Sequence, residues 1–165
     1  KAHTRIKGWF EETHPDLVIG ESLGAVHAIA LDNCPHLLVS PSLNAPIFFR
    51  IMSWVVLIPG MTSFFDRLYH PKEGDRQALH FERKVLRKWP LFRSLMLDNS
   101  PARGSRDYFH AFFGTHDHYR RTGVVSVRSW KKYFGDTFTL YDGTHFMEEE
   151  YIRTLLVPRI YSLLR

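Results

Sequence analysis

A five-residue segment, Gly-Glu-Ser-Leu-Gly at positions 20–24, constrains the fold of this chain more than any other feature. Apolar residues 17–19 precede the segment, and the mostly small residues 25–30 follow it. This order predicts a strand, a sharp turn and a helix, the setting in which a serine acts as a nucleophile. Such a turn strains the backbone and pushes the hydroxyl of Ser22 out beyond the sheet.

Two later segments end in the side chains that a serine nucleophile needs. The strand-like run 108–113 leads to Asp117, and the strand-like run 137–141 leads to His145. Asp142, in the Asp-Gly turn before His145, is the second candidate for the acid. A serine hydroxyl is a weak nucleophile, and an imidazole oriented by a carboxylate can accept its proton. Along the chain, the serine comes first, the acid second and the histidine third.

The serine turn and this order resemble the α/β-hydrolase family, and within it the small esterase-type members. The resemblance covers most of the chain outside residues 45–105. It implies an α/β fold in which helices flank a mostly parallel sheet in three layers. The family has several strands before the serine strand, and a loop among them donates to the oxyanion hole. We therefore expect this chain to be the C-terminal portion of such a fold.

The resemblance also implies a role for each residue of the site. Ser22 is the expected nucleophile, His145 the expected base, and Asp117 the acid that orients the imidazole. The remaining expected site residues are the backbone oxyanion donor Leu23 and the two glycines of the turn, Gly20 and Gly24, which we expect to leave no room for a Cβ.

Each of these side chains also has a purely structural interpretation. Ser22 could cap the following helix, Asp117 could cap a helix or form a turn, and His145 could lie in a surface turn. His116 and His118 flank Asp117, and two imidazoles with a carboxylate can bind zinc. Because residues two apart do not readily converge on one ion, we expect no metal site.

Residues 45–105 interrupt the alternation of strands and helices. We expect one domain over residues 1–165, with a core at 1–44 and 106–165 and a helical cap at 45–105 between core strands. The apolar run 47–58 is a second small core, an acyl-binding wall, or both. The wall would place Phe48, Met52 and Trp54 against the substrate. A lid that touches a membrane is the less favoured alternative, because the basic and aromatic residues are not clearly arranged as an interfacial helix.

Periodicity places the elements around these features. We expect strands at 16–20, 36–40, 108–114 and 137–141, and helices at 3–13, 22–32, 75–88, 123–134 and 147–164. Pro158 is expected to kink the last helix. Since the 16–20 strand should be central, its uncovered edge predicts pairing with an upstream segment or with a second copy of the chain.

Composition narrows the class of protein. With 165 residues, of which 44% are hydrophobic, the chain suits one ordered domain. A single cysteine, Cys34, excludes an internal disulfide and suits a reducing, cytoplasmic location. The net charge is +5, but no nucleic-acid-binding module accompanies it, so we expect no nucleic-acid partner. The longest apolar run, 51–61, is too short to cross a bilayer, so no stable membrane insertion is expected.

These features predict a serine hydrolase that needs no cofactor. The expected reaction is hydrolysis of a small-molecule carboxylic ester or related acyl bond through an acyl-enzyme on Ser22. A thioesterase, amidase or peptidase would use the same three side chains. The competing class is a non-catalytic α/β-hydrolase-like protein that binds a ligand or partner.

Overall fold

The computed structural model describes residues 2–31, 33–68, 81–98 and 108–164. The chain divides into two compact units, Lys1–Asn44 with Leu95–Arg165 and Ala45–Ser94. The strands described belong to the first unit, and the second unit is helical. The segment expected as a cap, 45–105, includes the second unit, and its residues 69–80 and 99–105 lie outside the described residues.

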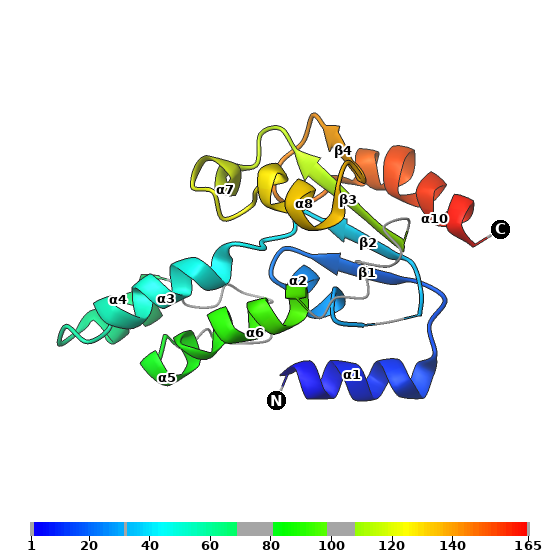
Figure 1. Cartoon of the computed structure of the whole chain (residues 1–165). Coiled ribbons are helices and arrows are strands. Elements are labelled where there is room, and N and C mark those ends of the chain that lie inside the picture. Colours follow the sequence, from blue (N-terminus) through cyan, green and yellow to red (C-terminus); the bar gives the residue numbers. More distant parts are fainter. Residues whose placement is uncertain (1, 32, 69–80, 99–107, 165) are drawn as a thin grey trace. The chain divides into compact units, whose positions relative to one another are not determined.

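The first unit is built on a parallel sheet of four strands, which Figure 1 shows side by side. The strands are β1 (Val18–Glu21), β2 (His36–Val39), β3 (Phe109–Gly114) and β4 (Phe138–Tyr141), and their order in the sheet follows the sequence. Parallel neighbours need long crossover connections, which is why helices separate them along the chain. The expected α/β class, a parallel sheet with flanking helices, is confirmed. All four strands lie within two residues of their predicted bounds.

The helices of the first unit differ more from the predictions. They are α1 (Ala2–Thr13), α2 (Gly24–Ala28), α7 (His118–Arg121), α8 (Val127–Phe134), α9 (Glu149–Tyr151) and α10 (Val157–Leu163). The helix expected at 22–32 is only α2, because i→i−3 bonds from Ala30 and Leu31 tighten its last turn. The helix expected at 123–134 begins at Val127, where the side chain of Ser126 caps it.

The expected helix at 147–164 is interrupted rather than simply kinked. A π-helical stretch, Ile152–Leu156, lies between α9 and α10, and Pro158 stands in the first turn of α10. Proline has no N–H and its ring clashes with the carbonyl four residues earlier. The wider π turn before Pro158 accommodates that conflict.

Apolar side chains of these helices pack against both sides of β3. Phe112 belongs to a buried cluster with Tyr141 and with Leu156 of the C-terminal helices. Phe113, which points to the opposite face because neighbouring strand residues alternate, packs edge-on against Trp130 of α8. These contacts fix β3 and β4, whose C-terminal ends deliver Asp117 and His145.

One edge of the sheet is open among the described residues. There, β1 pairs with β2 and with no other strand, as the sequence predicted. Ile19 of β1 remains 50% exposed. The strand that leads into Ser22 therefore depends on β2 for its backbone pairing.

The second unit consists of α3 (Ala45–Val55), α4 (Met61–Leu68), α5 (Arg83–Leu86) and the first part of α6 (Lys88–Asp98). The ring of Phe49 on α3 lies edge-on to Trp89 on α6, at 5.7 Å between centroids. The helix expected at 75–88 falls partly outside the described residues, and its described part is α5. Over the residues that the structure describes, no helix combines the length and apolar character needed to cross a membrane.

Candidate active site

Ser22 follows β1 directly, in a left-handed backbone conformation that a serine rarely adopts. Its φ is +52°, and its N–H donates to the carbonyl of Val39 at the end of β2, at 2.9 Å. The conformation ends the strand abruptly and turns the serine hydroxyl out of the sheet. This is the sharp turn that the sequence predicted.

The two glycines around Ser22 have different environments. A Cβ on Gly20 would lie 2.9 Å from the side chains of Ala28 and Leu38, so a side chain there would force β1 and α2 apart. A Cβ on Gly24 would meet nothing within 4 Å. The prediction that both glycines leave no room for a Cβ is therefore correct for Gly20 and wrong for Gly24, because the helix starts there on an exposed side.

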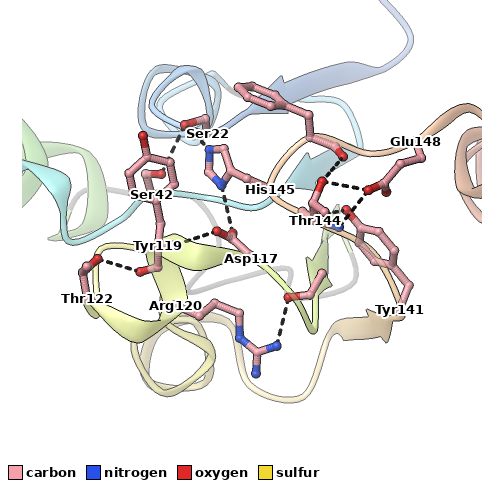
Figure 2. Close-up of polar contacts among 12 residues, drawn as sticks. Ser22, Ser42, Asp117, Tyr119, Arg120, Thr122, Tyr141, Thr144, His145 and Glu148 are labelled. Atoms are coloured by element: carbon pink, nitrogen blue, oxygen red, sulfur yellow. Dashed lines mark hydrogen bonds and ion pairs between the residues drawn. The ribbon is translucent and has the colours of Figure 1, made fainter. Parts of the chain in front are cut away.

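Three predicted site residues form one line of hydrogen bonds (Figure 2). The Oγ atom of Ser22 lies 2.9 Å from Nε2 of His145, and Nδ1 of His145 lies 2.8 Å from Oδ2 of Asp117. His145 and Asp117 are each 2% exposed, whereas Ser22 is half-buried. Each of the three residues follows the C-terminal end of a different strand: Ser22 follows β1, Asp117 follows β3 and His145 follows β4.

The two oxygens of Asp117 have separate partners. While Oδ2 faces His145, Oδ1 accepts the backbone N–H of Tyr119 at 2.8 Å, and Asp117 thereby caps α7. The cap fixes the rotation of the carboxylate. The capping interpretation of Asp117 and its contact with His145 therefore hold together.

The loop that carries His145 lies directly against the end of β3. The N–H groups of Thr115 and His116 donate to the carbonyls of Tyr141 and Gly143, at 2.8 and 2.9 Å. A Cβ on Gly114 would lie 2.1 Å from the carbonyl oxygen of Thr144, so only glycine permits this approach. Backbone hydrogen bonds thus join the loop that carries Asp117 to the loop that carries His145.

Hydrogen bonds within the His145 loop hold its shape. The Thr144 hydroxyl donates to Glu148 at 2.7 Å, and this bond lowers the pKa of the Glu148 carboxyl below its ordinary value. The Tyr141 hydroxyl donates to the Thr144 carbonyl at 3.2 Å, and burial raises the pKa of Tyr141 to about 12. Figure 2 shows these side chains on the far side of His145 from Ser22.

A second hydroxyl lies beside the Ser22 hydroxyl, which the sequence analysis missed. The Oγ atoms of Ser22 and Ser42 are 3.3 Å apart, and the N–H of Ser42 donates to the Ser22 carbonyl at 3.0 Å. If Nδ1 of His145 donates to Asp117, Nε2 accepts from Ser22, so Ser42 can donate to Ser22. The position of Ser42 just beyond the predicted strand 36–40 was the available indication, because such ends gather at one edge of a parallel sheet.

Aromatic rings flank the imidazole of His145. The rings of Tyr119 and Phe146 lie 4.6 and 5.0 Å from it between centroids, both edge-on. Both side chains are exposed. They provide apolar surface beside the imidazole that a bound ligand can cover.

The other candidate residues have other partners. Asp142 is exposed and pairs with Nε2 of His116 at 2.7 Å, so it does not contact His145. His116 and Asp117 therefore pair with different residues of the loop after β4, Asp142 and His145. Within the described residues, no group of three or more histidine, cysteine or acidic side chains is placed to hold a metal ion.

The structural interpretations of Ser22 and His145 are wrong. Leu23 occupies the cap position of α2, which has no side-chain cap, and the Ser22 hydroxyl bonds to side chains instead. His145 is buried rather than in a surface turn. The N–H of Leu23 donates to no acceptor among the described residues.

The three residues expected to contact substrate lie on α3 of the second unit. Phe48 and Trp54 are exposed there, and Met52 is half-buried. Their contact with a substrate stays a prediction.

Comparison with known proteins gives no relative of this chain. No protein family, curated protein or solved structure matches it significantly.

Proposed function

We propose that this protein is a serine hydrolase of the α/β-hydrolase type that cleaves a carboxylic ester or related acyl bond. One observation carries the proposal: the unbroken line of hydrogen bonds from Ser22 through His145 to Asp117. The left-handed turn at Ser22 and the order of serine, acid and histidine along the chain support the same family. The proposal includes the three-layer arrangement of that family.

In the proposed reaction, Oγ of Ser22 attacks the carbonyl carbon of the substrate while its proton passes to Nε2 of His145. The carboxylate of Asp117 holds the imidazole in the required tautomer and stabilises its charged form. The N–H of Leu23 donates to the oxyanion of the tetrahedral intermediate. His145 then protonates the leaving group as its bond to the carbonyl carbon breaks, which leaves an acyl group on Ser22.

Water completes the cycle. His145 accepts a proton from a water molecule that attacks the acyl-enzyme, and the carboxylic acid product leaves as Ser22 regains its proton. All protein groups in this cycle belong to the first unit. The proposed steps use only these groups, the substrate and water, so no cofactor is proposed. The proposed substrate is a small acyl compound, and the proposed location is the cytoplasm, which the single cysteine suits.

The test is intact-mass detection of a fluorophosphonate adduct, because this reagent reacts with activated serines. We expect one adduct on the native chain and none on Ser22→Ala. Ser126→Ala is the matched control, since Ser126 also precedes a helix but its hydroxyl caps that helix. We expect Ser126→Ala to be labelled normally.

Two outcomes would contradict the proposal. Labelling that persists in Ser22→Ala would place the reactive serine elsewhere. A folded native chain that gives no adduct would favour the non-catalytic ligand-binding class.

A further inference from the structure

The second unit carries the whole net charge of the protein. Residues 45–94 contain nine lysines and arginines against four acidic residues, which gives +5. The other residues contain thirteen of each sign. The excess positive charge, which favours anionic surfaces, therefore lies in the second unit.

Helix α3 of this unit exposes its most apolar side. Ile47, Ile51 and Trp54 are spaced four and three residues apart, so they lie on one face of the helix; we call them the α3 stripe. All three are exposed, with Ile51 at 59% and Trp54 at 63%. On the other side of α3, Pro46 and Ser53 are buried. Contiguous exposed apolar surface of this kind is characteristic of interaction sites.

A cationic side chain stands next to the α3 stripe, and others follow it in the sequence. The guanidinium of Arg83 on α5 lies over the Trp54 ring, 5.3 Å from its centroid. Nearby in the sequence, Lys84, Arg87 and Lys88 are exposed, and none of them forms an ion pair with an acidic side chain of the described residues. Their charge is available to an anionic partner.

We propose that the α3 stripe docks this protein on an anionic lipid surface. A helix that lies in a membrane interface buries an apolar face with tryptophan at the headgroup level, and neighbouring basic residues attract anionic headgroups. The second unit presents these features together at Trp54 and Arg83. Docking of this kind is peripheral. It is independent of the proposed chemistry at Ser22.

Co-sedimentation of the full chain with vesicles tests the proposal. One set contains phosphatidylcholine alone, and a second set replaces about a third of it with phosphatidylserine. We expect at least tenfold tighter binding to the anionic vesicles at low salt, and a clear loss at high salt because salt screens the attraction.

Paired variants distinguish binding through the α3 stripe from non-specific binding of the protein to vesicles. We expect Ile51→Ser with Trp54→Ser to weaken binding at least tenfold, and Arg87→Glu with Lys88→Glu to remove the preference for anionic vesicles. The controls alter matched residues of the first unit. Tyr161→Ser changes a side chain that is 64% exposed, and Lys132→Glu reverses an exposed charge. Both controls should bind as the native chain does.

A second measurement reports contact with the vesicles directly and does not require a variant that binds more weakly. Ile51→Cys is labelled with an environment-sensitive fluorophore, for which buried Cys34 is a poor competitor. We expect a blue shift and higher intensity when anionic vesicles are added, and no change for the same label at Tyr161→Cys.

Three outcomes would overturn the proposal. One is the absence of binding to either type of vesicle. Another is an Ile51 label that is already shielded from water without vesicles, which would mean that protein covers the stripe. The third is a Trp54→Ser variant that loses hydrolysis or labelling at Ser22 while vesicle binding is unchanged, which would assign Trp54 to the substrate.

Discussion

Nδ1 of His145 lies 2.8 Å from Oδ2 of Asp117, and the two side chains are almost fully buried. Replacing the acid by its amide keeps the shape but stabilises the wrong imidazole tautomer. We expect Asp117→Asn to slow fluorophosphonate labelling of Ser22 about 10⁴-fold. Stopped-flow or intact-mass kinetics on the folded variant measures this.

Asp142→Asn is the matched control, because Asp142 is the second candidate for the acid. Its carboxylate pairs with exposed His116 instead. We expect labelling within about twofold of the native rate, since exposed ion pairs contribute little. A large loss in Asp142→Asn together with a small loss in Asp117→Asn would reverse the assignment of the acid.

The hydroxyl of Ser42, 3.3 Å from that of Ser22, should orient the nucleophile. We expect Ser42→Ala to lower the labelling rate about fivefold, which corresponds to one neutral hydrogen bond of about 1 kcal/mol. Ser40→Ala is the control, because Ser40 is equally buried in the same loop and makes no hydrogen bond to Ser22. Equal effects of the two substitutions would show that Ser42 acts through packing alone.

The contrast between Gly20 and Gly24 predicts unequal effects of the same substitution. A Cβ at Gly20 would lie 2.9 Å from two side chains, whereas at Gly24 it would be in open space. We expect Gly20→Ala to lower the free energy of unfolding by about 1–3 kcal/mol through overpacking, and Gly24→Ala to leave it nearly unchanged. Urea denaturation followed by circular dichroism compares them. Equal stabilities would mean that β1 and α2 separate without cost.

Burial lowers the pKa of His36, at the start of β2, from 6.5 to about 4. Between these pH values the unfolded chain binds a proton that the folded protein excludes. The free energy of unfolding should therefore decrease as the pH falls from 6.5 to 4, by up to about 1.4 kcal/mol per pH unit from this residue. Urea midpoints at several pH values measure the slope.

His36→Leu removes this titration and should flatten the slope, even if the variant is less stable throughout. His27 and His110, whose pKa values burial also lowers to about 4, remain in both proteins and contribute equally to each. An unchanged slope in His36→Leu would show that other groups cause the acid sensitivity.

The strands and the three site side chains could be predicted from the sequence because short-range pattern determines them. Apolar runs bounded by turn residues indicate buried strands, and Ser22, Asp117 and His145 each follow such a run. Parallel strands bring those ends to one edge, and the resemblance to the α/β-hydrolase family selected these three side chains among the polar groups that follow the strands.

The structure differs from the sequence-based predictions where tertiary contacts or the detailed backbone conformation determine the outcome. The length of α2 depends on how its last turn tightens, and the π-helical stretch before Pro158 depends on one missing donor. Ser42 carries no motif, and its contact with Ser22 exists only once β1 and β2 pair. The difference between Gly20 and Gly24 is likewise invisible until their neighbours are known.

The backbone hydrogen bonds of Thr115 and His116 join the loop of Asp117 to the loop of His145, so these two side chains are held together. Ser22 follows β1, which is connected to β3 and β4 only through its pairing with β2. The distance between the Ser22 hydroxyl and His145 therefore depends on the pairing of β1 with β2. A shift of β1 along β2 would move the Ser22 hydroxyl relative to His145, while His145 and Asp117 keep their alignment.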